Sequence, residues 1–376
     1  MSVSTYVVVG AGLMGAATAW QLATRGEEVV LLERDVPAGE AGSSHGSARI
    51  FRYAYPEAFY ADLVVRAEPL WKRLEKDAGK QLIDRVGCVD HGRDRHPEVL
   101  ARVLERAGVE HALYSPAEAM ERWPQFIFDT PVLYQPGAGV LDAHTTVEAM
   151  VGLAVAAGAQ LHTSWPVTSI TRSGAGFVVT GRDGATLEAG HVVVAAGGWL
   201  PDLLQHLSLP PAFLAGLPQF TVMQENAYHF PYRDADQSWP TLIHKDAMQV
   251  YGLPGGRDAG FAGQKIAEYN GGRPMRSAAQ QDGVVDSVNR ARVVEYVKQH
   301  LPGLVPEPYA ETTCLFTNTP DEDFVLDSAD GVTVVSPCSG HGAKFAPLIG
   351  AMAADLATGA GDVPAVFRPG TGAFVR

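Results

Sequence analysis

Cysteine is scarce in this sequence, because only three of the 376 residues are cysteines. That number cannot build a disulfide framework, and without CxxC spacing it gives no reason to expect a metal site. Basic residues are also in the minority, since 42 acidic against 29 basic residues leave a net charge of −13. This charge repels phosphate backbones and anionic lipid. We therefore expect no nucleic-acid partner, no membrane partner and no metal.

Long hydrophobic runs are missing as well. The first apolar run, Tyr6 to Val9, ends at Gly10 and has no basic segment before it, which does not fit a secretory signal. No uninterrupted run reaches the roughly 18 apolar residues that a membrane span requires. We therefore expect a soluble protein of the cytoplasm.

What the sequence does have is apolar composition and glycine: 46% of the residues are hydrophobic and 40 are glycine. A chain of this length and composition can bury a large core, which excludes disorder. At about 100 to 200 residues per domain, the length suggests two domains or one large α/β body.

A glycine-rich turn lies in a complete βαβ pattern near the start of the chain. Gly10, Gly12 and Gly15 follow a buried strand expected over 3–9 and precede a helix expected over 16–24. A second buried strand over 29–32 ends in Glu33. The glycines permit a tight turn, a pyrophosphate at the helix N-terminus and close packing of helix on strand. A lone GxGxxG is weak, but this context predicts a dinucleotide site, and Glu33 favours FAD or NAD over NADP.

Further elements of this kind occur later in the chain. Phe177 to Glu188 predicts a hairpin around Asp183-Gly184, and Val192 to Ala196 predicts a buried strand that ends in Gly197-Gly198. Thr145-x-x-Glu148 suggests a capping box that opens a helix running to about Ala157. Val332 to Val335 predicts another buried strand, and a helix should follow from about Lys344 to Ala357.

The region between these elements has a different pattern. From about Pro218 to Thr313, prolines and glycines interrupt short apolar pieces, and no βαβ spacing appears. We therefore predict an α/β protein in which a Rossmann-type FAD-binding domain (1–80, 141–216 and 320–376) is interleaved with a smaller α+β substrate domain (81–140 and 217–319) carrying an antiparallel sheet.

Three separated motifs, in order along the chain, carry a family resemblance. They are Gly46-Ser47-Ala48-Arg49-Ile50-Phe51-Arg52, Cys314-x-x-Thr317-Asn318-Thr319-Pro320-Asp321-Glu322 and Ser339-Gly340-His341-Gly342-Ala343-Lys344-Phe345. Together with Gly10 they resemble monomeric sarcosine oxidase and the N-methyl-amino-acid oxidases, FAD-dependent amine oxidases of the D-amino-acid-oxidase-like superfamily. The resemblance extends to about Gly350 and implies a monomer.

The resemblance implies roles for four residues that would otherwise have ordinary structural interpretations. By itself Cys314 would be a buried core residue, and Arg49 and Arg52 would be exposed arginines. Lys344 at a helix start would oppose the helix dipole. In the family, the cysteine matching Cys314 forms a thioether with the flavin, and the arginine matching Arg49 lies beside the flavin ring. The residues matching Arg52 and Lys344 bind the substrate carboxylate, which suits the planar guanidinium of arginine.

The catalytic lysine of the family is harder to place. Matching it to Lys265 requires a short insertion after Tyr251-Gly252-Leu253-Pro254, and without that gap Ala262 occupies the position. The resemblance implies that this lysine promotes the reaction with O₂. Tyr269 stands where the family has histidine, and Phe316 stands where sarcosine oxidase has tyrosine. Cys338 replaces a bulkier aromatic residue. These departures favour a larger or more apolar amine than sarcosine.

The expected site follows from these matches. We expect Arg49, Lys265, Tyr269 and Phe316 to be catalytic, Arg52 and Lys344 to bind the substrate carboxylate, Tyr251 to line the pocket and Cys314 to carry the flavin. Contacts to FAD are expected from Gly10, Gly12, Leu13, Met14, Gly15, Glu33, Arg34, Ser44, His45, Arg49, Val167, Ala196, Gly197, Gly198, Gly340, Gly342 and Lys344.

The function implied is oxidation of a secondary or cyclic α-amino acid to an imine, with O₂ reoxidising the flavin to give H₂O₂. Two alternatives stay open. One is an FAD-dependent amine dehydrogenase that uses another electron acceptor. The other is a non-catalytic dinucleotide-binding protein, against which the presence of Arg49, Arg52, Cys314 and Lys344 argues.

Overall fold

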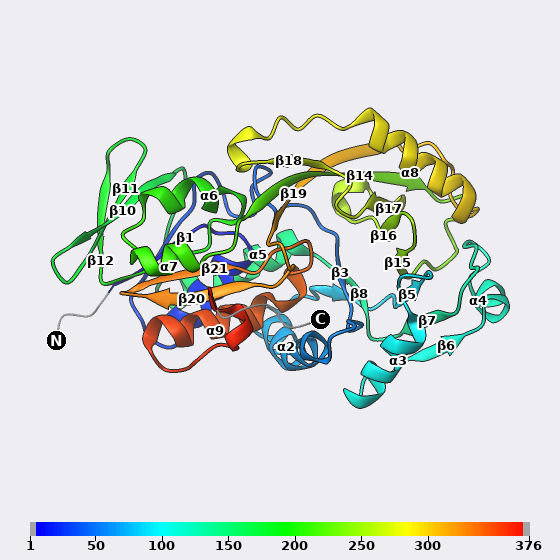
Figure 1. The fold of residues 1–376 in the computed structure, drawn as a ribbon, viewed down its shortest axis with the longest axis horizontal. Coiled ribbons are helices and arrows are strands. Elements are labelled where there is room, and N and C mark those ends of the chain that lie inside the picture. The colour runs from blue at the N-terminus through cyan, green and yellow to red at the C-terminus, as the bar shows by residue number, and fades with distance from the viewer. Residues whose placement is uncertain (1–4, 371–376) are drawn as a thin grey trace.

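A computed structural model of the chain describes residues 5–370. The molecule is elongated, with one sheet and its helices in the left half of Figure 1 and a second sheet in the right half. No helix within residues 5–370 is long and apolar enough to cross a membrane.

The first sheet has six strands in the order β20-β21-β13-β1-β2-β9. The strands are β1 (Tyr6–Val9), β2 (Val29–Leu32), β9 (Gln160–His162), β13 (His191–Val194), β20 (Val325–Ala329) and β21 (Val332–Ser336). All neighbours pair in parallel except β20 and β21. Every residue of β1 and β2 is buried, as expected for parallel strands covered on both faces.

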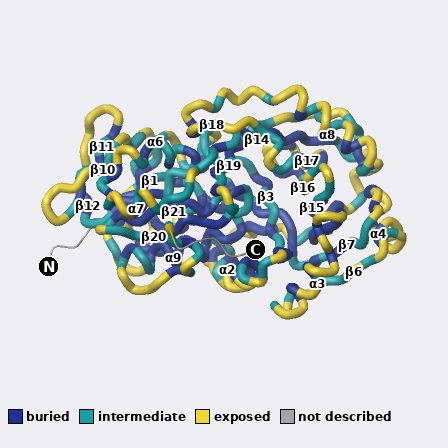
Figure 2. Tube along the Cα trace, in the orientation of Figure 1, coloured by how far each residue is buried: buried dark blue, intermediate teal, exposed yellow. Residues whose placement is uncertain are grey.

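Helices cover this sheet and form the largest part of the core. They are α1 (Leu13–Thr24), α2 (Ala58–Ala78), α5 (Ala143–Ala156) and α9 (Ala346–Thr358), and α1 packs against both α5 and α9. The other face is closed by a ribbon of β10 (Val167–Ser173), β11 (Gly176–Gly181) and β12 (Thr186–Ala189) with α6 (Leu200–Leu203) and α7 (Pro211–Gly216). Figure 2 shows burial concentrated in the sheet, whereas the ends of this ribbon are exposed.

The second sheet has nine strands. The order is β18-β14-β17-β16-β15-β5-β7-β6, and β19 also pairs with β14. The strands are β5 (Cys88–His91), β6 (Ala112–Tyr114), β7 (Val132–Gln135), β14 (Thr221–Pro231), β15 (Thr241–Lys245), β16 (Gln249–Pro254), β17 (Gly263–Glu268), β18 (Arg273–Met275) and β19 (Ala310–Asn318). Only β5 and β15 pair in parallel, so the sheet is mainly antiparallel.

Helix α8 (Ser287–His300) packs on the second sheet, and α3 (Pro97–Arg106) and α4 (Pro116–Arg122) flank β6 and β7 (Figure 1). A small sheet of β3 (Arg49–Phe51), β8 (Gly139–Leu141) and β4 (Ile83–Asp84) lies between the two large sheets. The mixed α/β fold class predicted from the sequence is confirmed. The domain boundaries stay a prediction, although each large sheet takes its strands from one of the two predicted sets of segments.

Two local predictions need correction. The helix predicted to open with a capping box at Thr145 begins at Ala143 instead, because Asp142 is its N-cap and accepts a 3.0 Å hydrogen bond from the Thr145 N–H. Carboxylates are strong N-caps, and Asp142 lies just before the pattern we used. The region from Pro218 was expected to hold short pieces, yet β14 has eleven residues and α8 has fourteen.

Candidate active site

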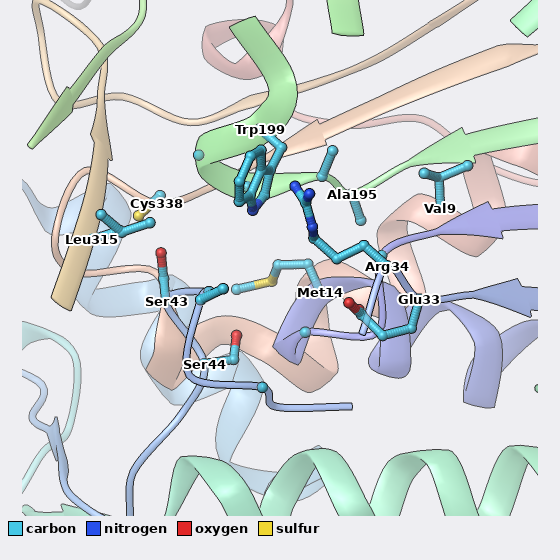
Figure 3. A pocket seen from close by; sticks show the side chains of 18 of the residues that line it. Val9, Met14, Glu33, Arg34, Ser43, Ser44, Ala195, Trp199, Leu315 and Cys338 are labelled. Atoms are coloured by element: carbon cyan, nitrogen blue, oxygen red, sulfur yellow. The ribbon is translucent and has the colours of Figure 1, made fainter. Parts of the chain in front are cut away.

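A cavity of about 490 Å³ opens at the carboxyl ends of β1 and β13. Figure 3 shows Glu33 and Arg34 at one end and Leu315 and Cys338 at the other. Ligands of open parallel sheets bind at this edge, where the first strand turns into a helix. The cavity therefore lies where a dinucleotide binds in proteins with such a sheet.

The glycine turn shapes the middle of this cavity. Gly10 has a φ of +98°, and a Cβ there would lie 2.5 Å from the Ala195 carbonyl oxygen. A Cβ on Gly12 would lie 2.8 Å from Ser44 Oγ, which accepts a hydrogen bond from the Leu13 N–H. A Cβ on Gly15 would lie 1.7 Å from the Gly10 oxygen. Each glycine therefore permits a close approach, and the N-terminus of α1 is open to an anionic group.

Glu33 and Arg34 form the end farthest from Cys338. A Glu33 carboxylate oxygen accepts a 2.7 Å hydrogen bond from the Ala11 N–H, which turns the side chain toward the glycine loop. Burial raises the pKa of Glu33. The Arg34 guanidinium lies 3.3 Å from the centre of the Trp199 ring. Glu33 thus lines the cavity where its carboxylate would accept hydrogen bonds from the ribose hydroxyls of a bound dinucleotide.

Two features of the first cavity are suited to binding FAD. Ser43 Oγ is buried without a hydrogen-bond partner in residues 5–370, although Ser43 lines the cavity. The glycine turn leaves a cradle that a Cβ would fill. The Ser43 hydroxyl is thus available for a hydrogen bond to a bound dinucleotide. The glycine turn lets the backbone come close to the dinucleotide phosphates.

A second cavity of about 320 Å³ adjoins the first. The two share Arg49, Cys314, Phe316, Gly340 and Ala343 as lining residues. Strand β19 therefore supplies Cys314 and Phe316 at the place where the cavities meet. Arg49, Cys314 and Phe316 are therefore the residues that could contact both a flavin held in the first cavity and a substrate in the second.

Lys265 is close enough to Arg49 and Cys314, which line both cavities, to interact with them electrostatically. It is only 6% exposed and lines the second cavity, whereas Ala262, the alternative match, is exposed and lines neither cavity among the described residues. Burial and the neighbouring Arg49 lower the pKa of Lys265 to about 8. Burial raises the pKa of Cys314, while Lys265 and Arg49 act in the opposite direction.

The predicted carboxylate ligands Arg52 and Lys344 both line the second cavity. Tyr55, which the sequence analysis did not single out, lies with them. Lys344 Nζ donates a 2.9 Å hydrogen bond to the Tyr55 hydroxyl and a 2.6 Å bond to the His341 carbonyl oxygen. Burial and Arg52 place the pKa of Lys344 well below its usual range. A bound carboxylate would offset this cationic field.

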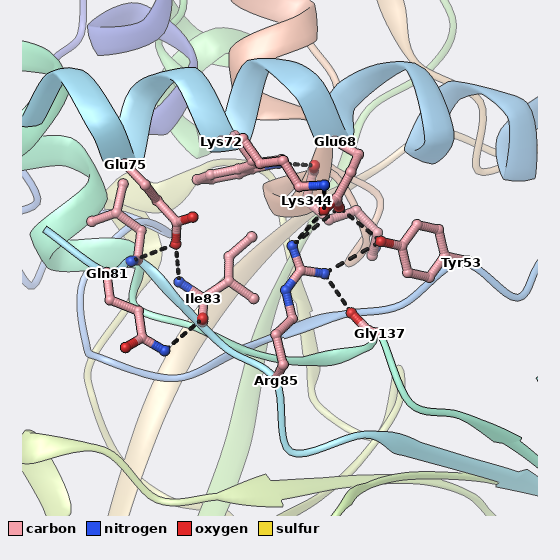
Figure 4. A network of polar contacts seen from close by, with 11 residues as sticks. Tyr53, Glu68, Lys72, Glu75, Gln81, Ile83, Arg85, Gly137 and Lys344 are labelled. Carbon is pink, nitrogen blue, oxygen red and sulfur yellow. Dashed lines mark hydrogen bonds and ion pairs between the residues drawn. The ribbon is translucent and has the colours of Figure 1, made fainter. Parts of the chain in front are cut away.

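Polar contacts hold the segment that carries Lys344. The Trp71 indole of α2 donates a 2.7 Å hydrogen bond to the Lys344 carbonyl oxygen. On the same helix Glu68 accepts two hydrogen bonds from Arg85, at 2.9 and 3.1 Å, and one from the Tyr53 hydroxyl at 2.7 Å (Figure 4). Helix α2 therefore contacts both the segment that carries Lys344 and the segments around Tyr53 and Arg85.

Tyr251 and Tyr269 line the wall of the second cavity. The Tyr269 hydroxyl is 3.0 Å from both a Glu322 carboxylate oxygen and the Ser339 carbonyl oxygen, so it can donate to one of them. Its ring lies 5.8 Å from that of Phe316. Burial raises the pKa of both tyrosines far above the neutral range, which keeps their hydroxyls protonated.

The structure brings most of the predicted site residues together. The exceptions are Gly15, which packs beneath the turn, and His45, which lines neither cavity. His45 contributes its carbonyl oxygen, which accepts a 2.7 Å hydrogen bond from Arg49. Cys338 lines the first cavity at the Phe316 end. We retain all these assignments as predictions.

Sequence reasoning missed several lining residues, namely Ser43, Tyr55, Arg95, Lys245 and Glu322. Tyr55 could have been found from its position three residues after Arg52. Lys245 and Arg95 belong to none of the sequence motifs. They reach the cavity because β5 and β15 pair side by side.

The chain is an FAD-dependent oxidoreductase: it belongs to the FAD dependent oxidoreductase (DAO) family, whose model matches residues 5–356. It is 31% identical to N-methyl-L-tryptophan oxidase of Yersinia pestis (strain Pestoides F), with 93% of each chain covered. The structure resembles that of NikD, an unusual amino acid oxidase essential for nikkomycin biosynthesis, with a TM-score of 0.84, 26% identity and 97% and 98% of the two chains covered. L-proline dehydrogenase from P. horikoshii shares the fold, with a TM-score of 0.81, 20% identity and coverage of 98% and 97%.

These findings confirm the family predicted from the three motifs and the requirement for FAD.

Proposed function

We propose that this chain oxidises a secondary or cyclic α-amino acid to an imine and that O₂ is the electron acceptor, giving H₂O₂. The observation that carries the proposal is the junction of the two cavities at Arg49, Cys314 and Phe316. One cavity suits the dinucleotide part of FAD, and the other suits a small substrate. Bound FAD would take two electrons from the substrate C–N unit and pass them to O₂.

The second cavity supports an acidic substrate. Arg52, Lys245 and Lys344 line it, and within residues 5–370 none of them forms an ion pair with a carboxylate. Arg95 is the exception in this cavity, because it pairs with Asp90 at 2.5 Å. A substrate carboxylate would supply the negative charge that these cations lack, and charged partners strengthen such hydrogen bonds. Arg52 and Lys344 hold the carboxylate in this proposal.

We also propose that Cys314 attaches the flavin through a thioether, in which an S–C bond replaces the Cys314 S–H bond and one C–H bond of a flavin methyl group, and the two electrons and two protons released pass by way of the flavin to O₂. Cys314 lines both cavities and is 8% exposed. Lys265 and Arg49 nearby favour its thiolate against the effect of burial, and the thiolate is the nucleophilic form of cysteine. Cys88 lines neither cavity among the described residues.

Lys265 carries the oxidase part of the proposal. Lys265 lines the second cavity and interacts electrostatically with Arg49 and Cys314, which line both cavities, and there its ammonium group would stabilise the negative charge that develops on O₂ as it is reduced. No general base is assigned, because an amine that enters unprotonated needs none. The chain's residues then orient the substrate and hold charge. Monomeric state and cytoplasmic location remain predictions.

A dehydrogenase that uses another acceptor is the alternative, and the same purified enzyme distinguishes the two. A panel of N-methyl and cyclic amino acids is assayed with an oxygen electrode and peroxide detection, and again anaerobically with an artificial dye. The proposal expects peroxide in amounts that match O₂ consumption. Turnover with the dye alone would support the dehydrogenase, and no turnover with any acid in either assay would contradict the enzyme function proposed here.

A further inference from the structure

Two histidines stack against each other on the second sheet. His91 ends β5 and His244 lies in β15, and the two residues are direct partners in the parallel register. Their ring centres are 4.0 Å apart with an angle of 18° between the planes. Both are buried, with exposed fractions of 2% and 3%. Strand pairing thus fixes two imidazoles side by side.

The ring nitrogens of this pair are incompletely satisfied. His244 Nδ1 is 2.9 Å from the Tyr296 hydroxyl, but His244 Nε2 and His91 Nδ1 are buried with no hydrogen-bond partner in residues 5–370. A proton on His244 Nδ1, donated to Tyr296, leaves the lone pair on Nε2. Histidine ligands of metal ions are commonly oriented in this way by a hydrogen bond to their other nitrogen.

A carboxylate completes a cluster with the two histidines. Asp129 is exposed on the segment before β7, and one ligand atom from each of His91, Asp129 and His244 lies within 4.8 Å of the others. His300, at the end of α8, has its ring centre 5.2 Å from that of His244. Two neutral imidazoles and a carboxylate form a ligand set that suits Zn²⁺.

We propose that His91, His244 and Asp129 bind one divalent transition-metal ion, with Zn²⁺ as the best match and water or His300 in the fourth position. Tetrahedral Zn²⁺ with bonds of about 2.0 to 2.1 Å holds its ligand atoms roughly 3.3 Å apart. Because the stacked rings direct their in-plane lone pairs in nearly parallel directions, both rings have to rotate out of the stack for their nitrogens to converge on one ion, and Asp129 has to approach them. Asp129 is free to do so because it is exposed.

The electrostatics agree with this geometry. Burial lowers the pKa of His244 to about 4 and that of His91 well below its usual range. The groups that face the pair are His300, Asp129, Asp246, Arg93 and Tyr296.

The backbone at Gly92 comes close to the His244 ring and to Lys245, and only a residue without a Cβ leaves room for this contact. Gly92 has a φ of +109°, and a Cβ there would lie 2.8 Å from a ring carbon of His244 and 2.2 Å from the Lys245 oxygen.

The proposed metal site is separate from the candidate active site. His91, Asp129 and His244 line neither of the two cavities described above. Their neighbour Asp90 points to the opposite face of β5, because side chains alternate along a strand, and it pairs with Arg95 of the second cavity. The metal would therefore stabilise the second sheet rather than react with substrate.

Metal binding to the FAD-loaded enzyme, stripped with a chelator, tests the proposal. Zn²⁺ is titrated by calorimetry and Co²⁺ by its visible spectrum. We expect one equivalent of each to bind, with a Co²⁺ spectrum typical of nitrogen and oxygen ligands. Zn²⁺ should also raise the Tm, because it binds only the folded state.

Asp129→Asn and His244→Gln should each weaken binding by at least tenfold. Asp129 is exposed, so Asp129→Asn keeps the test valid should His244→Gln fail to fold. Asp236→Asn, at another exposed aspartate, and His111→Gln are matched controls and should bind as the wild type does. Absence of saturable binding, affinity unchanged in both Asp129→Asn and His244→Gln, or a thiolate charge-transfer band with Co²⁺ would each overturn the proposal.

Discussion

Tyr55 contacts both cations that we assign to the substrate carboxylate. Its hydroxyl accepts the 2.9 Å hydrogen bond from Lys344, 289 residues away in the chain. Its ring lies 4.4 Å from the guanidinium carbon of Arg52. A single side chain therefore sets the distance between a residue near the start of the chain and one near its end. Tyr55 acts as a positioning residue for the proposed carboxylate site.

Replacing Tyr55 by Phe keeps the ring beneath Arg52 and removes one of the two hydrogen-bond partners of Lys344 Nζ, together with the contact between the Tyr55 hydroxyl and His341 Nδ1. Loss of one hydrogen bond of about 0.5 to 1.5 kcal/mol should raise KM for a carboxylated amine about threefold to tenfold, with a smaller change in kcat. Steady-state kinetics measure the two constants separately. Tyr309→Phe, whose hydroxyl donates to Ala259 outside both cavities, is the control and should not change KM. A loss confined to kcat would contradict a positioning role.

Arg52→Ala and Lys344→Ala should each lower kcat/KM for an acidic amine about tenfold to hundredfold. The reason is the loss of one charge-assisted contact worth about 1.5 to 3 kcal/mol. An amine of similar shape without the carboxylate should be a poor substrate for the wild type, and the two substitutions should affect it much less. Full activity of both variants on every acid would show that these residues do not bind the carboxylate.

The covalent link at Cys314 predicts a simple result on denaturation. A thioether survives acid, so the yellow colour should stay with the precipitated protein. Cys314→Ser should release FAD into the supernatant or yield apoprotein. Cys88→Ser and Cys338→Ser are the matched controls and should keep the flavin attached. Flavin that leaves the wild-type protein completely would contradict the link.

Lys265→Met keeps the length of the side chain and removes its charge. We expect reoxidation of the reduced enzyme by O₂ to slow by about 10²-fold or more, the scale observed when one preorganised charge partner is lost. Reduction by substrate without O₂ should fall much less. Stopped-flow measurement of each half-reaction decides the matter. Reoxidation at the wild-type rate would show that Lys265 has no role in it.

The pKa of Lys265 gives this reaction a pH dependence. Its pKa is lowered from 10.5 to about 8, first by burial and then by Arg49. The ammonium form dominates below that value, so the rate of reoxidation should be highest below pH 8 and fall as the pH rises through it. Lys265→Met should be slow at all pH values, and a wild-type profile that is flat across pH 7 to 9 would contradict the assignment.

The stability of the fold should change in the opposite direction over part of this range. Between about pH 8 and 10.5 the unfolded chain binds the proton on Lys265 more strongly than the folded chain does. The contribution of Lys265 to the free energy of unfolding therefore rises with pH in that window. Denaturant unfolding of the wild type and of Lys265→Met at several pH values measures the difference, which should disappear in the variant.

Local patterns were enough to predict the first sheet and its turn. Gly10, Gly12 and Gly15 have short-range steric requirements, and the buried strands before and after them have a composition that few other elements share. The hairpin around Asp183-Gly184 was predicted for the same reason, and it is present as β11 and β12. The helix start at Asp142 was missed because Thr145-x-x-Glu148 offered a competing capping pattern.

The sequence by itself therefore determined the family, the FAD-type turn and the residue types of the candidate site. Which residues meet was decided by the tertiary structure. Lys265, and not Ala262, lines the second cavity because β17 pairs with β14 and β16 in one register. Tyr55 joins Arg52 to Lys344, and His91 meets His244, only through contacts between distant segments. Such contacts depend on how distant strands pair and pack, and the local periodicity of the sequence does not predict which distant residues will meet.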